Sequence, residues 1–303
     1  MSSEETLAEL LRHLKDAGYR FTTVTPTTHA AVLARPAPAE IGLRDIFGWN
    51  RSFAAGDLDL HLVELLQSAD ALEMANDKLR SKVRVASLGS QLFLHGAFPT
   101  DGDDAVFFGP DTYRFARFVQ QRLAELPDRG WLVDMGAGCG GGGITAACSR
   151  PFSRVTLVDV NDAALRLARI NAAGAGIAVE TVSGSSVPPG ANVMIANPPY
   201  MMDPAARTYR DGGDLHGGAI TLDWVTQALT ALHPGGSMLL YTGVAYVAGE
   251  APLITELERV CADAGASLEL DEIDPDVFGE DLDQPSYSDV ERIAAVGAVI
   301  TTA

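Results

Sequence analysis

The stretch Trp131-Leu132-Val133-Asp134-Met135-Gly136-Ala137-Gly138-Cys139-Gly140 decides the fold. Four of its first five residues are apolar, which is typical of a buried strand, and the glycines that follow continue to Gly143. Glycines let a chain turn sharply, bring bare backbone N–H groups to a ligand and open a helix whose positive end faces that ligand. The stretch therefore predicts a strand, a ligand-binding loop and a helix in direct succession.

Strand and helix patterns alternate on the carboxyl side of this stretch. Strands are expected at 131–135, 155–160, 177–182, 193–196, 238–242, 268–273 and 293–300, and helices from 144 and at 163–172, 222–232 and 254–264. Repeated strand–helix units predict a parallel, doubly wound sheet. The last two strands are joined by an acidic loop without a helical apolar pattern, which predicts an antiparallel finish. The expected fold is an α/β, Rossmann-like, seven-stranded doubly wound sheet with an antiparallel last strand.

The first 100 residues follow a different, mostly helical pattern. The first expected element is a helix with leucines from Leu7 to Leu14, which Ser3 caps and Gly18 ends. An irregular segment at 22–38, a short helix within 41–53, an apolar stripe at 58–72 and β-like stretches at 82–88 and 91–98 follow. After the polar turn at 99–104, a helix that Asp111 or Thr112 can cap is expected to run through Leu123. Helices followed by a small hairpin predict a winged-helix-like domain at 1–100 that precedes the main domain at 101–303.

Four basic residues alternate near the expected hairpin: Lys78, Arg80, Lys82 and Arg84. On a strand they would share one face. Such a face can be a wing that contacts phosphates, or a solvated edge that resists aggregation.

Composition and charge limit the possible partners. The formal net charge is −18, and residues 101–303 hold 28 acidic against 12 basic residues, a field that repels free nucleic acid and favours cationic partners or a small substrate. Apolar residues make up 47% of the chain, as in soluble proteins, and no apolar run is long enough for a membrane span. The acidic amino terminus is no secretory signal, and the three cysteines are scattered without metal-ligand spacing. We expect a reduced, cytoplasmic protein without a metal site or a membrane partner.

Asn197-Pro198-Pro199-Tyr200 ends the apolar run 191–196. The Asn197 side chain offers a carbonyl acceptor and an NH2 donor, whereas the prolines offer carbonyls but no N–H. A planar amine or amide could donate its hydrogens to Asn197 and to a proline carbonyl while Tyr200 covers one face. An ordinary turn after a strand is the alternative.

The carboxylates near the glycines limit which cofactors the loop could bind. Asp159 lies at the end of the second expected strand, 25 residues beyond Asp134, and is placed to accept hydrogen bonds from a ribose diol. Gly136, Gly138 and Gly141 also satisfy the spacing of dinucleotide-binding loops, so the loop alone does not separate nicotinamide from another adenosine cofactor. Asp134 could meet a cationic amino-acid end, and hydride transfer does not require Asn-Pro-Pro-Tyr.

Taken in order, residues 133–140, Asp159 and residues 197–200 resemble the three signatures of S-adenosylmethionine-dependent methyltransferases. The branch with Asn-Pro-Pro-Tyr includes protein-glutamine methyltransferases of release factors and small-domain rRNA and tRNA base methyltransferases. The resemblance covers about residues 105–303. It implies S-adenosyl-L-methionine as the cofactor and methyl transfer to a planar amide or exocyclic amino nitrogen.

The resemblance also implies roles for individual residues. The methionine part of the cofactor would lie at Gly136, Ala137, Gly138 and Gly140, and its amino group would lie at Asp134. The ribose would lie at Asp159 and Val160, and the adenine near Ser185, where the family often has an acidic residue. Asn197, Pro198 and Tyr200 would hold the acceptor nitrogen, and Asn197 would also border the cofactor. The segment 108–113 could fold over the cofactor. The glycine-studded loop 208–218 could be a lid, and Tyr113, Arg210 and His216 are candidate substrate contacts.

Three functions stay open at this point. The first is an N-methyltransferase that acts on a protein side-chain amide of the glutamine type, which the negative charge favours. The second is an rRNA, tRNA or DNA base N-methyltransferase, which the basic residues near the hairpin favour. The third is a non-catalytic module that binds S-adenosylmethionine or a nucleotide. The partner is thus a methyl-acceptor protein or a nucleic acid, and the sequence does not decide the oligomeric state.

Overall fold

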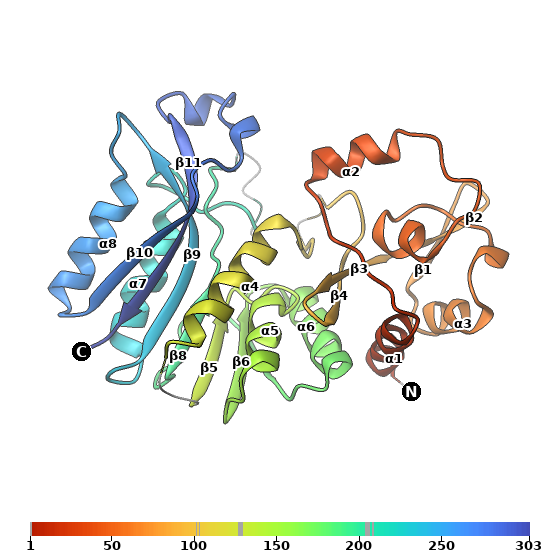
Figure 1. Cartoon of the computed structure of the whole chain (residues 1–303), viewed down its shortest axis with the longest axis horizontal. Helices are drawn as coiled ribbons and strands as arrows, with labels where there is room; N and C mark the ends of the chain where they lie inside the picture. Colours follow the sequence, from red (N-terminus) through yellow and green to blue (C-terminus); the bar gives the residue numbers. More distant parts are fainter. Residues whose placement is uncertain (1, 101, 103, 127–129, 204–206, 208) are drawn as a thin grey trace.

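The computed structural model describes residues 2–100, 102, 104–126, 130–203, 207 and 209–303. Its centre is a seven-stranded sheet of order β7-β6-β5-β8-β9-β11-β10, in which β11 runs antiparallel to both neighbours and the other pairs are parallel (Figure 1). The strands are β5 Trp131–Met135, β6 Arg154–Asp159, β7 Glu180–Ser183, β8 Val193–Ala196, β9 Ser237–Tyr246, β10 Ser267–Asp274 and β11 Arg292–Thr301. This confirms the predicted doubly wound sheet with an antiparallel last strand.

Helices cover both faces of the sheet. They are α4 Pro110–Leu123, α5 Gly141–Ser149, α6 Asp162–Ala175, α7 Ala219–Ala231 and α8 Pro252–Asp263, and two short 3₁₀ turns, Gly279–Asp281 and Pro285–Tyr287, lie between β10 and β11. In β5, Leu132 packs into the core under α4, α5 and α6, while Val133 packs into the core under α7 and α8. Successive strand residues point to opposite faces, so strands covered on both sides must be apolar throughout. None of the helices within the described ranges is long and apolar enough to cross a membrane.

The amino-terminal region is built from helices and two small hairpins. Its elements are α1 Ser3–Asp16, α2 Pro26–Leu33, a π-type turn at Arg44–Gly48, a 3₁₀ turn at Ala55–Asp57, α3 Leu60–Ser68, and the antiparallel pairs β1 Leu72–Ala75 with β2 Lys78–Ser81 and β3 Val83–Leu88 with β4 Gln91–Gly96. Three expectations were wrong. Ser2, not Ser3, caps α1 and forms a capping box with Glu5. A helix, α2, lies in the segment expected to be irregular, and β1–β2 is an additional hairpin.

The four basic residues do not form one exposed face, contrary to the expectation. Arg84 is buried, and its guanidinium donates to the Gly96 carbonyl at 2.8 Å and to the Thr100 hydroxyl at 3.2 Å. Arg80 donates to the Phe98 carbonyl. Lys82 pairs with Asp70 at 3.0 Å, and Lys78 is exposed. Because the chain turns between β2 and β3, these residues lie on two hairpins, and two of the cations are used to hold the segment that follows β4.

The amino-terminal region packs directly on the sheet domain. Leu11 of α1 lies against Gly174 of α6, where an added Cβ would come within 2.9 Å of the Leu11 side chain. The buried Asn171 side chain accepts from the Leu94 N–H at 2.7 Å and donates to the carbonyls of Leu94 and Cys139. One hydrophobic core runs from α1 to the sheet. The division at residue 100 therefore remains a prediction about the sequence, while in space the two parts share a core.

Candidate active site

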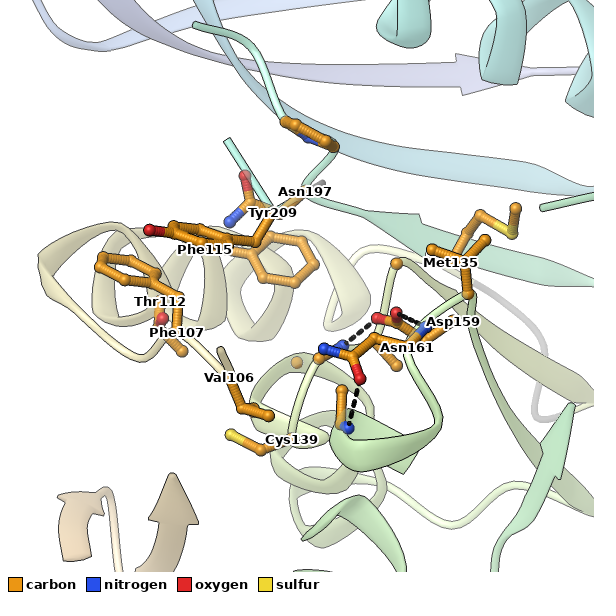
Figure 2. A pocket seen from close by; sticks show the side chains of 18 of the residues that line it. Val106, Phe107, Thr112, Phe115, Met135, Cys139, Asp159, Asn161, Asn197 and Tyr209 are labelled. Atoms are coloured by element: carbon orange, nitrogen blue, oxygen red, sulfur yellow. Dashed lines mark hydrogen bonds between the residues drawn. The ribbon is translucent and has the colours of Figure 1, made fainter. Parts of the chain in front are cut away.

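The carboxyl ends of β5, β6, β7 and β8 surround one cavity of about 370 Å³. This is the edge at which parallel α/β sheets bind ligands, because the crossover loops diverge there. Figure 2 shows Asp159 and Asn161 on one side of the cavity and Asn197, beside Tyr209 and Phe115, on the other. The sheet therefore brings together the residues of all three sequence signatures.

The glycine loop forms the floor of the cavity on the β5 side. Gly136, Gly138 and Gly140 have φ angles of 69°, 55° and 84°, in the left-handed region that favours glycine. A Cβ on Gly136 would come within 2.6 Å of the Trp224 ring, so this position also needs the smallest residue. Gly136, Ala137 and Gly138 line the cavity, as expected of them. Gly140 does not line it and instead turns the chain into α5, its added Cβ meeting Ile144 at 2.6 Å.

Asp159 joins the glycine loop to the end of β6. Its carboxylate accepts from the Gly138 N–H at 2.8 Å and from the Asn161 N–H at 2.9 Å. Burial raises the pKa of this carboxyl, and the backbone donors oppose the rise. Val160 and Ser185, both exposed, line the same side of the cavity. Because a carboxylate has lone pairs left after two such bonds, Asp159 can still accept from a diol.

Asp134 lies under the loop and does not line the cavity, which differs from the expected contact with a ligand amino group. It is 1% exposed, and one oxygen accepts from the Gly143 N–H at 2.7 Å. Burial raises its pKa to about 7, with a further contribution from the charge of Asp159. The strand pattern explains the difference, because Asp134 precedes the turn at Gly136 and points into the sheet's α5 face. In this structure Asp134 supports the first turn of α5.

Asn197 reaches the cavity from the end of β8. Its side-chain oxygen is buried and accepts no hydrogen bond from any of the described residues. Pro199 lines the cavity, whereas Pro198 is buried outside the lining. A buried acceptor without a donor costs about 1–3 kcal/mol. A polar side chain held in this state at a cavity wall is suited to accept from a ligand N–H.

Tyr200 does not cover the cavity, contrary to the expectation. It is 7% exposed, its ring lies where a Cβ on Gly243 would sit, and it packs edge-on against Tyr241 and Phe278. The pKa of its hydroxyl is raised well above the usual value, mainly by burial and next by Asp111. Strand β9 has a glycine, Gly243, opposite the turn, which leaves room for the Tyr200 ring. The ring packs there and holds the Asn-Pro-Pro backbone in place.

The loop after this turn is tied to the segment between β10 and β11. Arg210 pairs with Asp281 at 2.6 Å, and His216 pairs with Asp289 at 3.1 Å. Neither residue lines the cavity, nor does Tyr113, whose hydroxyl accepts from the Thr23 N–H at 2.9 Å. Thr208, the first residue of the expected lid, lies outside the described residues. The three candidate substrate contacts thus do not line the cavity.

Aromatic side chains that the sequence did not single out wall the cavity: Phe107, Phe115, Tyr209 and Trp224. Phe107 and Tyr209 stack with ring centroids 6.1 Å apart and nearly parallel planes, and the Tyr209 hydroxyl donates to the Thr100 carbonyl at 2.9 Å. Phe108 and Thr112 also line the wall, in agreement with the expectation that segment 108–113 folds over the cavity. An aromatic residue inside a glycine-rich loop was the available signal for Tyr209.

Residues 115–248 match the family model described as "Methyltransferase small domain". Over these residues the chain is similar to small-domain, S-adenosylmethionine-dependent methyltransferases. Two similar curated proteins are both named release factor glutamine methyltransferase. The one from Neisseria gonorrhoeae is 33% identical over 46% of this chain and 50% of its own length, and the one from Deinococcus radiodurans is 27% identical over 70% and 80%.

Two further comparisons concern a ribosomal RNA enzyme and a solved structure. The ribosomal RNA small subunit methyltransferase C of Ectopseudomonas mendocina is 35% identical over 34% of this chain and 35% of its own length. The crystal structure of Trm5b from Pyrococcus abyssi superposes with a TM-score of 0.51 at 14% identity, covering 82% of this chain and 69% of that one, which supports the fold. The matched region thus spans half of the Neisseria protein's length and a third of the Ectopseudomonas protein's.

The cavity fits the cofactor of this family. S-adenosylmethionine combines an adenosine, whose ribose carries a diol, with an amino-acid end and a sulfonium. Asp159 offers acceptors for the diol, and Gly136 and Gly138 line the cavity with backbone that carries no side chain. The aromatic wall of Phe107, Phe115 and Trp224 suits an adenine or a sulfonium.

Proposed function

We propose that this protein transfers a methyl group to a planar amide nitrogen of a protein side chain of the glutamine type. The observation that carries the proposal is the buried, unpaired oxygen of Asn197 at the wall of the cavity. A primary amide has two N–H hydrogens, and one of them would give this oxygen the donor that no described residue supplies.

The cofactor supplies an electrophilic methyl group bound to a sulfonium. The protein's own part is to orient the acceptor and to remove it from water. Asn197 would accept one N–H hydrogen, and neither Pro198 nor Pro199 presents an N–H that would compete for the acceptor's lone pair. The aromatic wall around Phe107 and Tyr209 keeps the reacting nitrogen apart from solvent.

Asn197 would also stabilise the transition state electrostatically. As the nitrogen shares its lone pair with the methyl carbon, positive charge develops on it and on its hydrogens. A carbonyl dipole fixed in a buried site stabilises that charge without reorganising. Tyr200 contributes by position, since its ring is locked under the turn against Gly243 and Tyr241. No side chain needs to act as a general base before methyl transfer, because the nitrogen can lose its proton after the N–C bond forms.

A protein acceptor is favoured over a nucleic acid by charge. The net charge is −18, and the guanidinium groups of Arg80 and Arg84 bind backbone carbonyls of residues 96 and 98 rather than facing outward. Phosphate binding normally needs exposed Lys and Arg side chains. The two relatives named release factor glutamine methyltransferase support the same choice.

The test is methyl transfer from labelled S-adenosylmethionine to a cell extract by the purified full-length chain, followed by identification of the product. We expect label in protein that survives RNase and is lost with protease. Acid hydrolysis of the labelled protein should release methylamine, which only an N-methylated side-chain amide yields among these products. Label that stays with lysine, arginine or a carboxyl ester would contradict the proposal.

A second function, base N-methylation of RNA, is favoured by the likeness to the Ectopseudomonas enzyme named for ribosomal RNA. The same assay separates the two, since RNase would then remove the label and nuclease digestion would give a methylated nucleoside. An inactive wild-type chain that still binds the cofactor would instead favour a binding module.

A further inference from the structure

Three side chains with metal-binding atoms converge on the amino-terminal region, at the contact between α1 and α3. Glu9 and His13 belong to α1, and His61 lies in the first turn of α3. The two helices lie side by side in Figure 1, and none of the three residues lines the cavity described above. The methyltransferase chemistry proposed above uses none of these residues.

The distances between the three ligand atoms suit one metal ion. The Nε2 atoms of His13 and His61 are 3.0 Å apart, and Glu9 Oε1 lies 3.7 Å from each of them. The point equidistant from three atoms so arranged lies about 2.0 Å from each, which is the length of Zn–N and Zn–carboxylate bonds. A Zn²⁺ displaced from the plane of the three atoms toward an open fourth position would lie slightly farther from each atom, so small side-chain adjustments suffice for tetrahedral binding.

The local structure positions the ligands. Glu9 and His13 are four residues apart, so their side chains lie one above the other on the same face of α1. His61 is placed by the start of α3, where Asp59 caps the helix by accepting from the His61 N–H at 2.9 Å. Buried leucines of both helices, including Leu10 and Leu66, fix the distance between them.

The exposure of the site suits an ion that keeps water. The side chains of His13 and His61 are 45% and 47% exposed, and that of Glu9 is 27% exposed, so a fourth position toward solvent stays open. Two imidazole nitrogens facing each other can share only one hydrogen when both rings are neutral. An ion would instead take the lone pairs of both nitrogens and the charge of the carboxylate.

We propose that Glu9, His13 and His61 bind one divalent transition-metal ion, with Zn²⁺ the best match to two imidazoles and a carboxylate. The sequence predicted no metal site, because these ligands meet only after α1 and α3 pack. The ion would clip α3 to α1, whose first turn contacts the sheet domain through Glu4 and Arg169 at 3.2 Å.

The experiment is calorimetric titration of tag-free, chelator-treated full-length protein with ZnSO₄, and separately with MgCl₂. We expect one Zn²⁺ per chain with a Kd in the micromolar range or tighter, and no measurable Mg²⁺ binding because Mg²⁺ prefers oxygen ligands. The matched variants are His61→Ala in the cluster and His233→Ala at an exposed histidine elsewhere. His61→Ala should weaken Zn²⁺ binding at least tenfold, and His233→Ala should leave it unchanged.

Thermal unfolding is a second measurement, for the case that the heat of Zn²⁺ binding is too small to titrate. At a hundredfold excess of Zn²⁺ over Kd, the Tm of the wild type should rise by about 3–6 °C, and that of His13→Ala/His61→Ala should not. Equal Zn²⁺ affinity of the double variant and the wild type would overturn the proposal, and so would the absence of binding. S-adenosylmethionine binding should stay the same in all variants, so this result is independent of the proposed methyl transfer.

Discussion

Two loops at the same edge of the sheet differ in how their polar groups are satisfied. On the side of β5 and β6, which we call the cofactor side, the carboxylates of Asp134 and Asp159 accept hydrogen bonds from backbone N–H groups of Gly138, Gly143 and Asn161. On the side of β8, the acceptor side, the oxygen of Asn197 is buried and has no donor among the described residues.

This difference assigns cofactor binding to one side of the cavity and the methyl-transfer step to the other. A loop whose polar groups are already paired is preorganised, so it can hold a cofactor with little change of structure. An acceptor that stays unpaired gains its hydrogen bond only when a suitable donor enters. Changes on the cofactor side should therefore act on cofactor affinity, and changes on the acceptor side should act on turnover. The predictions below test that division, beginning with the largest expected effect.

Replacing Asn197 by Ala should lower kcat by about 10²–10³-fold, because one fixed dipole that stabilises developing charge is lost. The affinity for S-adenosylmethionine should stay within about threefold of the wild type, since the cofactor side is unchanged. The measurement pairs single-turnover methyl transfer with equilibrium cofactor binding. A tenfold loss of cofactor affinity with normal turnover of the bound enzyme would reverse the assignment of the two sides.

Replacing Asp159 by Ala should give the opposite pattern. Hydrogen bonds to a charged group contribute about 1.5–3 kcal/mol, so cofactor affinity should fall by about 10–100-fold. At saturating cofactor the rate should recover most of its wild-type value. Asp159→Asn is the matched control, because it keeps one acceptor and should lose less affinity. Unchanged affinity in Asp159→Ala would show that the diol binds elsewhere.

The pH dependence of stability tests the carboxyl under the glycine loop. The pKa of Asp134 is raised from 3.8 to about 7, so between these values the native state keeps a proton that the unfolded chain has released. Stability conferred by this group is thus full below about pH 4 and is lost as pH rises through 7. Asp134→Asn keeps an acceptor for the Gly143 N–H but cannot ionise.

Chemical unfolding at pH 5 and at pH 7 measures this effect. The wild type should lose about 1–2 kcal/mol more than Asp134→Asn over that interval, below the limit of about 1.4 kcal/mol per pH unit for one proton. Asp159, whose pKa is also raised, is present in both proteins, so most of its contribution cancels in the comparison. Parallel pH profiles of the two proteins would mean that the Asp134 carboxyl does not change its charge on unfolding in this range.

The aromatic wall should have the smallest effect. Tyr209→Ala removes the stack on Phe107, and aromatic pairs contribute about 0.5–1.5 kcal/mol, so KM should rise by about 2–12-fold. Tyr209→Phe keeps the stack and loses only the hydrogen bond to the Thr100 carbonyl, so its KM should rise less. Steady-state kinetics with varied cofactor and varied acceptor would show which of the two the wall touches. If Tyr209→Phe were as impaired as Tyr209→Ala, the hydroxyl rather than the stack would matter.

The sheet domain could be predicted from the sequence because its central strands are mostly apolar and end at recognisable loops. The glycines after β5, Asp159 after β6 and Asn197 after β8 reach one edge by topology alone. Side-chain direction at the turn was not predictable. The Tyr200 ring does not line the cavity because it packs against Gly243, 43 residues later in β9. A local sequence pattern does not indicate that a distant strand has room for a ring.

The amino-terminal region was harder for a related reason. Helix α2 is short and only one of its residues is buried, so the apolar periodicity that identifies helices is absent, although Thr25 before Pro26 is a readable start. Arg84 looked like part of a basic face, and its burial depends on carbonyls beyond β4. The approach of His13 to His61 likewise depends on the packing of two helices, which local sequence does not specify.

The most direct test of the division between the two sides is a crystal structure of the full-length chain with S-adenosylhomocysteine and a glutamine-containing peptide that the labelling assay identifies as the acceptor. We expect the ribose hydroxyls to bind Asp159 and the glutamine side-chain nitrogen to lie about 2.7–3.2 Å from Asn197 Oδ1. An amide bound away from Asn197, with that oxygen paired to another protein group or to the cofactor, would contradict the account.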